Sequence, residues 1–115
     1  MVLAKKYRLY KKDDFRRMYH KSSRRVSWKY GVVMYRKNNA PQSCFAFVVS
    51  VKVSKKSAVR NLLKRRTSEW IRKNLGRIRA GYDMAFVFSK NAAEAKPAIF
   101  FQDLEAFFQS IRMIL

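Results

Sequence analysis

Hydrophobic residues recur at two kinds of spacing along this chain of 115 residues, and each kind predicts a different element. Near the N-terminus, Phe15, Met18 and Tyr19 fall at positions i, i+3 and i+4, which is the spacing of one face of a helix. Asp13 is a suitable N-cap for this helix, and Asp14 would lie in its first turn, where the helix dipole favours a carboxylate. The pattern therefore predicts a first helix with an aromatic and apolar stripe.

Two later segments alternate between apolar and polar positions, as strands do. The alternation in 26–37 would place on one face Trp28, Tyr30, Val32 and Met34. The alternation in 44–53 would place on one side Phe45, Phe47, Val49, Val51 and Val53. The turn-forming stretch "NNAPQS" separates the two segments, so we expect them to form a hairpin. A third strand is predicted by the short apolar run "GYDMAFVF".

Helical spacing returns in the basic segment 55–74 and near the C-terminus. Gly76 supplies a stop for the basic helix, and Pro97 can occupy the first position of the last one. The last helix has a wide apolar face, which we interpret as core: Phe100, Phe101, Leu104, Phe107, Phe108, Ile111 and Leu115. The segment 89–97 is expected to be a loop with a helical turn.

The order helix, strand, strand, helix, strand, helix predicts an α+β sandwich, with helices packed on a mostly antiparallel sheet. We expect one domain over 1–115, with 1–10 as a flexible basic N-terminus. If the second and third strands are parallel, the general rule predicts a right-handed crossover between them.

The basic helix divides into two faces on a wheel of about 100° per residue. Leu62, Leu63 and Trp70 cluster on one side, which we expect to pack on the sheet. The other side is expected to present to the outside Arg60, Asn61, Lys64, Arg65 and Arg72. Like charges spaced i,i+4 destabilise a helix by a few tenths of a kcal/mol per pair, so such a face needs an external anion. Lys55 and Lys56 add donors at the helix N-terminus, where the dipole also favours anions.

The net charge of +20 is concentrated in the first two thirds of the chain. Residues 1–79 hold 24 Lys and Arg against 3 Asp and Glu, whereas residues 80–115 hold 3 against 4. A polyanionic partner explains this imbalance best, and nucleic acid is the commonest one. A generic basic surface and a membrane-binding surface are the alternatives, although the mixed strand pattern does not favour a membrane.

The same composition argues against several other classes of function. Cys44 is the only cysteine and His20 the only histidine, so neither an intrachain disulfide nor a four-ligand zinc site is expected. Cys44 opens an apolar strand and is interpreted as a buried structural thiol. The seven acids are scattered apart from the predicted cap, so an autonomous nuclease site is not expected. No apolar run is long enough for a signal peptide or a membrane span, and a reducing cytoplasm is the expected location.

The stretch "KKSAVRNLLKRR" resembles the signature of the bacterial ribonuclease P protein subunit, which has a Lys-rich lead-in, Ala-Val, Arg-Asn-Arg, an apolar residue and Lys-Arg. The matching positions are Ala58, Val59, Arg60, Asn61, Leu63, Lys64 and Arg65. Leu62 stands where the family usually has Arg, and on the wheel it faces the core. The stretches "RLYKKDDFRRMYHKSS", "GVVMYRKN" and "GYDMAFVF" extend the resemblance over nearly the whole chain.

The resemblance implies the small protein cofactor of an RNA enzyme that removes the 5′ leader from precursor tRNA. It implies that catalysis rests on Mg²⁺ held by the RNA subunit, with no catalytic residue and no cofactor in the protein itself. It also implies a left-handed βαβ crossover, against the general rule. The rival interpretation is a noncatalytic structural RNA-binding protein, either ribosomal or a nonspecific nucleic-acid binder.

Residue by residue, the resemblance implies RNA contacts by Arg60, Asn61, Lys64 and Arg65 of the basic helix. It implies that Phe15, Tyr19 and Tyr35 line a cleft between the first helix and the sheet, where the single-stranded leader is held. Aromatic faces beside a basic groove suit single-stranded nucleic acid on general grounds too, because bases stack on them. Phe15 is equally consistent with the core, and Trp28 and Tyr30 fit packing better than binding.

Overall fold

The computed structural model describes residues 3–9, 18 and 23–114, and at its centre lies a four-stranded mixed sheet in the order β1-β2-β4-β3. The strands are β1 (Arg24–Trp28), β2 (Gly31–Lys37), β3 (Cys44–Val48) and β4 (Tyr82–Phe88). The pairs β1–β2 and β2–β4 are antiparallel, and β3 is parallel to β4. Together with the helices described next, this sheet confirms the predicted α+β sandwich.

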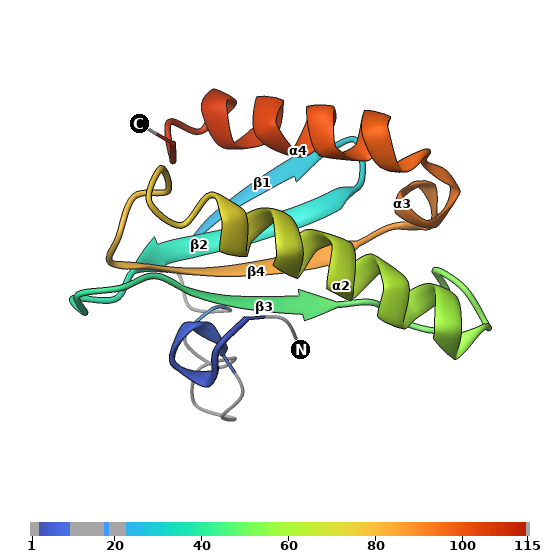
Figure 1. The fold of residues 1–115 in the computed structure, drawn as a ribbon, viewed down its shortest axis with the longest axis horizontal. Helices are drawn as coiled ribbons and strands as arrows, with labels where there is room; N and C mark the ends of the chain where they lie inside the picture. The colour runs from blue at the N-terminus through green and yellow to red at the C-terminus, as the bar shows by residue number, and fades with distance from the viewer. Residues whose placement is uncertain (1–2, 10–17, 19–22, 115) are drawn as a thin grey trace.

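Helices α2 (Ser57–Lys73) and α4 (Pro97–Ser110) lie side by side on one face of the sheet, and the short α3 (Lys90–Glu94) precedes α4 (Figure 1). In Figure 1, the parallel strands β3 and β4 both run to the right, and β4 lies above β3. Helix α2, which connects them, passes in front of the sheet. This arrangement makes the β3–α2–β4 crossover left-handed. The general rule therefore predicted the wrong hand, and the implication of the family resemblance is confirmed.

The segment 26–37 forms two strands rather than one, and they meet at a tight turn formed by Lys29 and Tyr30. Gly31 ends that turn with φ +134, and a Cβ added there would lie 2.1 Å from the Val87 carbonyl oxygen. Only glycine fits, since the backbone conformation and the close approach both exclude a side chain. The predicted hairpin between 26–37 and 44–53 is also wrong, because β4 lies between β2 and β3.

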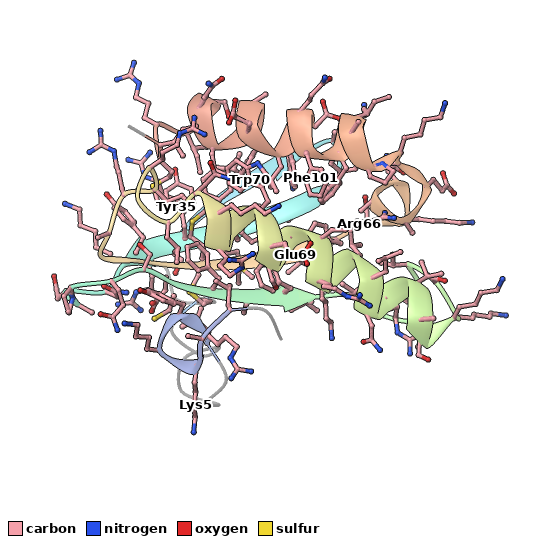
Figure 2. All side chains as sticks on the ribbon, viewed as in Figure 1. Lys5, Tyr35, Arg66, Glu69, Trp70 and Phe101 are labelled. Carbon is pink, nitrogen blue, oxygen red and sulfur yellow. The ribbon has the colours of Figure 1, made fainter. Side chains whose placement is uncertain are left out.

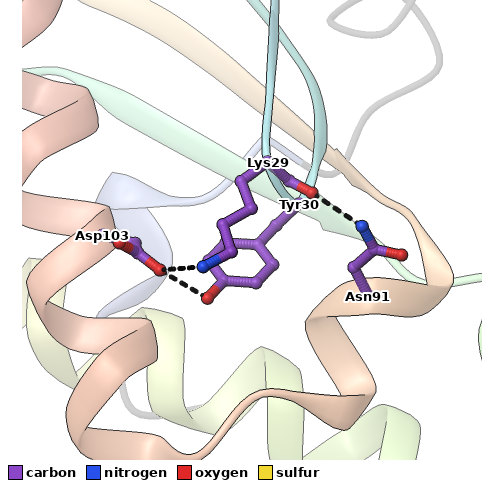
Figure 3. Close-up of polar contacts among 4 residues, drawn as sticks. All are labelled: Lys29, Tyr30, Asn91 and Asp103. Atoms are coloured by element: carbon purple, nitrogen blue, oxygen red, sulfur yellow. Dashed lines mark hydrogen bonds and ion pairs between the residues drawn. The ribbon is translucent and has the colours of Figure 1, made fainter.

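The turn between β1 and β2 is held against α3 and α4 by polar contacts (Figure 3). The Tyr30 hydroxyl donates to Asp103 Oδ2 at 2.6 Å, and Lys29 Nζ contacts the same oxygen at 3.2 Å. Asn91 Nδ2 donates to the Lys29 carbonyl oxygen at 3.2 Å. Burial and the Asp103 carboxylate raise the pKa of Tyr30 to about 12, and the hydrogen bond from Tyr30 lowers the pKa of Asp103. Tyr30 is 1% exposed, which confirms that it packs in the core.

Most of the core lies between the sheet and its two long helices, and it is largely aromatic. Phe86 of β4 is fully buried, with ring centroids 6.3 Å and 5.9 Å from those of Phe107 and Phe108 in α4. Pro97 occupies the first turn of α4, as predicted. Burying each such ring contributes about 1.5–3 kcal/mol of transfer free energy. Four residues of the predicted apolar face are therefore confirmed as core: Phe100, Leu104, Phe107 and Phe108. Phe101 and Ile111 are half-buried, α4 ends at Ser110, and Leu115 lies outside the described residues.

A smaller apolar cluster covers the opposite face of the sheet, and its members are Leu9, Met18, Met34, Ala46 and Ala85. The described part of the N-terminus, 3–9, includes the 3-10 turn η1 (Lys5–Tyr7) and reaches β3, where the Leu9 N–H donates to the Phe45 carbonyl oxygen at 2.9 Å. Cys44 is half-buried beside it, with Sγ 3.2 Å from the Lys6 carbonyl oxygen.

Candidate nucleic-acid interface

Helix α2 packs on the sheet through a stripe that differs from the one its apolar residues predict. Its buried residues are Leu63, Thr67, Ser68 and Ile71. The two hydroxyls are compatible with burial because Thr67 Oγ1 donates to the Leu63 carbonyl oxygen and Ser68 Oγ donates to that of Lys64, at 2.9 and 2.7 Å. The stripe therefore runs through positions that hydrophobicity alone assigns to the outside.

Helix α2 is therefore rotated about its axis relative to the predicted orientation, and this changes where the signature residues lie. Leu62, expected in the core, is 36% exposed, whereas Leu63 is 3% exposed. Asn61, Arg65 and Arg72 are exposed, as predicted. Leu62 thus lies at the surface, in the position where the family usually carries another cation.

Arg60 and Lys64 lie on the same side of α2 as the buried stripe, in its N-terminal turns, rather than at the centre of an outer face, and both are half-buried. Arg60 Nη1 donates to the Ser54 carbonyl oxygen at 2.8 Å, which fixes the guanidinium beside the loop that leads into the helix. Lys55 and Lys56 are exposed in that loop, and Lys56 is the N-cap residue of α2. The cations therefore extend from the loop around the N-terminus of α2 and along its outer side.

Trp70 and Arg66 complete the side of α2 that faces α4. The Trp70 ring stacks on Phe108 with centroids 5.0 Å apart, and Figure 2 shows Trp70 and Phe101 between the two helices. Arg66 is half-buried on this side, as is usual for an arginine whose aliphatic stem lies along the protein surface while its guanidinium reaches solvent. This side of α2 consolidates the fold, and the opposite side remains open to a partner.

Tyr35 lies on the face of the sheet opposite to the one predicted. It packs against the core under α4, with its ring centroid 6.4 Å from that of Tyr82, whereas its neighbour Met34 joins Met18 on the other face. The prediction that Tyr35 lines a cleft beneath the first helix is therefore wrong. The turn at Lys29 and Tyr30 changes which alternate residues of the following strand face the core, and the apolar pattern alone does not reveal that turn.

The other predicted cleft residues, Phe15 and Tyr19, lie outside the described residues, as do the proposed cap residue Asp13 and its neighbour Asp14. The described part of that segment is Met18, which is helical and 1% exposed. It packs on the sheet face opposite α2 and α4, beside the half-buried Val32 and Val87.

Sequence reasoning also missed a second group of cations, at the end of the sheet where β1 and β4 begin. Arg24, Lys37, Arg79 and Arg112 line one pocket there. These four residues are far apart in the chain. Basic residues recur at both ends of the predicted strands, and this recurrence could have drawn attention to them. Sequence spacing alone does not bring them together.

Across residues 3–9, 18 and 23–114, no three His, Cys, Asp or Glu side chains form a group that could hold a metal ion. The buried Asp83 carboxylate accepts a hydrogen bond from Asn38 Nδ2 at 2.9 Å, so one of its oxygens has a hydrogen-bond partner within the protein. Within the same described residues, no helix is both long and apolar enough to cross a membrane. A mixed sheet that carries a cationic helix on a packed aromatic core defines a protein suited to binding a polyanion.

Comparison with known proteins agrees with a polyanion-binding protein and identifies its family. The Ribonuclease P family matches residues 3–112. The Ribonuclease P protein component of Fusobacterium nucleatum is 31% identical over 84% of this chain and 86% of its own length. That of a Picosynechococcus species is 32% identical over 91% of this chain and 90% of its own length.

Solved structures show the same fold. The RNase P protein from Thermotoga maritima superposes with a TM-score of 0.77 at 30% identity, covering 87% of this chain and 93% of that one. The RNase P protein of Staphylococcus aureus superposes with a TM-score of 0.85 at 23% identity, covering 95% and 98%, which is a likeness of fold. The chain therefore belongs to the Ribonuclease P family as a protein component of that ribonucleoprotein. As such, it acts together with the RNA of ribonuclease P.

Proposed function

We propose that this chain binds the RNA subunit of ribonuclease P through the outer side of α2 and assists removal of the 5′ leader from precursor tRNA. The observation that carries the proposal is the pair Arg65 and Arg72, which are exposed and which no ion pair joins to an acid within the described residues. Phosphates neutralise such cations and release condensed counterions, which favours association. Arg60 and the lysines before α2 extend the same surface.

The sheet face that Met18 covers is the proposed site for the leader. Val32 and Val87 are half-buried there, and the proposal adds Phe15 and Tyr19 of the first-helix segment as stacking partners for single-stranded bases. Mg²⁺ ions bound by the RNA subunit would supply the hydrolytic chemistry, and the protein would contribute binding and positioning. The bacterial cytoplasm is the proposed location.

A reconstitution assay tests this function directly. The purified protein is added to a bacterial ribonuclease P RNA at low Mg²⁺, and cleavage of precursor tRNA is measured in a single turnover. We expect faster cleavage with the protein and tighter binding of precursor than of mature tRNA, since only the precursor carries a leader. No gain in cleavage would contradict the proposal and favour a noncatalytic RNA-binding protein.

A charge-matched pair of variants connects this assay to α2. Arg65→Ala/Arg72→Ala removes two cations from the proposed surface, whereas Lys90→Ala/Lys96→Ala removes two exposed cations from α3 and the residue before α4. The first pair should require more protein to reach half-maximal stimulation, and the second should behave as the wild type. Equal behaviour of the two variants would contradict the assignment of the RNA-binding surface to α2.

A further inference from the structure

A pocket of about 540 Å³ opens at the end of the sheet where β1 and β4 begin and β2 ends. Its size falls within the range of roughly 300–1,000 Å³ that is usual for ligand sites. The residues that define its chemistry are Arg24, Lys37, Arg79, Arg112, Tyr35 and Tyr82. No acidic residue is found among the described residues that line it.

Strand register explains why these side chains converge. Arg24 lies opposite Tyr35, and Lys37 lies opposite Tyr82, so side-chain alternation directs all four to the face that α4 covers. Helix α4 ends at Ser110, and the chain that follows it lines the pocket instead of covering it. One corner of the sheet face is therefore left open, with two half-buried tyrosines forming part of its lining.

The turn after α4 brings two arginines together at this pocket. Arg112 adopts the left-handed conformation with φ +58, which is uncommon for a residue with a side chain. Its carbonyl oxygen accepts a hydrogen bond from Arg79 Nε at 2.7 Å, and the Arg79 N–H donates to the Met113 carbonyl oxygen at 2.8 Å. The chain segments that carry Arg79 and Arg112 are therefore joined by hydrogen bonds where both line the pocket.

The charge of the pocket is not balanced within the described protein. Nearby Arg77 is paired with Glu105 at 2.8 Å, but no such pair is found in the described structure for Arg24, Lys37 or Arg112. Exposed like charges around one concave site create a positive potential that attracts anions. Tyrosine rings in the same site add faces on which a base can stack.

We infer that this pocket binds one nucleotide unit of single-stranded RNA, with its base against Tyr35 or Tyr82 and its phosphate held by the surrounding cations. The inference rests on the proposed function, because it presupposes an RNA partner. The C-terminal end of α2 lies at the same end of the sheet as the pocket (Figure 1). An RNA that contacts Arg72 is therefore close to a second contact through this site.

The first test removes cations and measures binding of a labelled single-stranded RNA of about ten nucleotides, within the usual site sizes for such proteins. Arg24→Ala/Arg112→Ala should flatten the log–log salt dependence by about 1.4, or about 0.7 for each lost phosphate contact. Lys90→Ala/Lys96→Ala is the charge-matched control and should leave the slope unchanged. A pocket variant that behaves as this control would overturn the inference.

The α2 variant Arg65→Ala/Arg72→Ala, measured with ribonuclease P RNA, separates failure of the inference from failure of the proposed function. If the α2 variant loses affinity and the pocket variant does not, the pocket assignment is wrong and the RNA-binding role of α2 stands. If the pocket variant alone loses affinity for single-stranded RNA, the pocket assignment stands and the role of α2 does not.

The second test addresses the aromatic part of the site. Tyr82→Phe should bind the labelled RNA as the wild type does, whereas Tyr82→Leu should lose roughly 5-fold or more, because it removes the stacking face. In the intact protein, a photoreactive uridine in the RNA should cross-link to Tyr35 or Tyr82, which does not depend on the folding of a variant. Cross-links confined to other residues would overturn the inference.

A competition arm separates a nucleotide from a bare anion. Adenosine monophosphate should displace the labelled RNA at lower concentration than inorganic phosphate does, because phosphate alone lacks a stacking group. Equal displacement by the two compounds would show a simple anion site and would overturn the assignment to a nucleotide.

Discussion

Helices α2 and α4 lie side by side on one face of the same sheet, yet they differ in charge and in how they pack. Helix α4 contains no Lys or Arg and buries a stripe of Phe100, Leu104, Phe107 and Phe108. Helix α2 carries six Lys and Arg and one Glu, and half of its four buried residues are hydroxyl residues. The comparison shows that a narrow stripe is enough to dock a helix here. The charge on α2 therefore exceeds what the fold requires, and we attribute it to the RNA partner.

If this division is right, changes on the α4 side should alter stability and changes on the outer side of α2 should alter RNA binding. The largest effect is expected for Phe108→Ala, which removes a fully buried ring that contacts Trp70 and Phe86. The free energy of unfolding should fall by about 3–5 kcal/mol, measured by urea denaturation.

Ile99→Ala is the control on the same helix, since Ile99 is 45% exposed. It should change the free energy of unfolding by less than about 0.5 kcal/mol. Similar losses for Phe108→Ala and Ile99→Ala would mean that α4 does not dock through the stripe described.

A glycine pair tests the turn that α4 holds in place. Gly31→Ala should destabilise the protein by about 3 kcal/mol, because strain at positive φ and a clash with the Val87 carbonyl oxygen combine. Gly76→Ala is the matched control, since an added Cβ there meets no atom within 4 Å. Thermal melting of both variants checks this, and a Gly31→Ala protein as stable as Gly76→Ala would contradict the tight turn.

Adjacent leucines test the phase of α2. Leu62→Arg should leave the free energy of unfolding within about 0.5 kcal/mol of the wild type, because the side chain is at the surface. It should also strengthen binding of ribonuclease P RNA and steepen its salt dependence by about 0.7–0.9 if the new cation reaches a phosphate.

Leu63→Arg is the control for this change, and it should unfold the protein, because an unpaired charge would be placed in the core. If Leu62→Arg destabilised the protein as severely as Leu63→Arg, both leucines would be in the core, as hydrophobicity predicts, and the observed orientation of α2 would be contradicted.

The smallest effect concerns pH and the contact between the turn and α4. The pKa of Tyr30 is raised to about 12 in the folded protein, so its stabilising contribution is complete below pH 10 and declines as the pH rises towards 12. The pKa of Asp103 is lowered, so its contribution is present above pH 3.8 and declines as the pH falls through the lower folded value.

Denaturation of the wild type and Tyr30→Phe across this pH range measures both declines. The variant should show a flatter profile at both ends, because it lacks the phenol and the hydrogen bond to Asp103. Profiles that run parallel would exclude the contact as the source of the pH dependence.

The start of α4 and its buried face could be predicted from the sequence because the residues that mark them are each compatible with few positions in a helix. Pro97 fits only the first turn, and three of the four phenylalanines at helical spacing are buried, namely Phe100, Phe107 and Phe108. The phase of α2 was predicted wrongly because Thr67 and Ser68 satisfy their hydroxyls within the helix and can be buried, while Leu62 is left outside. Apolar character alone does not reveal such exchanges.

Strand neighbours and the faces of side chains were less predictable than the strands themselves. The position of β4 between β2 and β3 depends on long-range pairing, and the turn at Lys29 and Tyr30 reverses which residues face α4. The cleft role that the resemblance implied for Tyr35 is wrong because this turn places Tyr35 on the face that α4 covers. The cations of α2 were identifiable from sequence because they are close together in the chain, whereas those of the pocket meet only in the folded protein.

The most direct test of the central claim, that the outer side of α2 is neutralised by RNA, is the salt dependence of binding to ribonuclease P RNA. The affinity of the wild type and of Arg65→Ala/Arg72→Ala is measured over a series of KCl concentrations, with Lys90→Ala/Lys96→Ala as the charge-matched control. The account predicts that the α2 variant binds more weakly and that its log–log slope is flatter by about 1.4–1.8, for two lost phosphate contacts. A slope equal to that of the wild type and the control would contradict it.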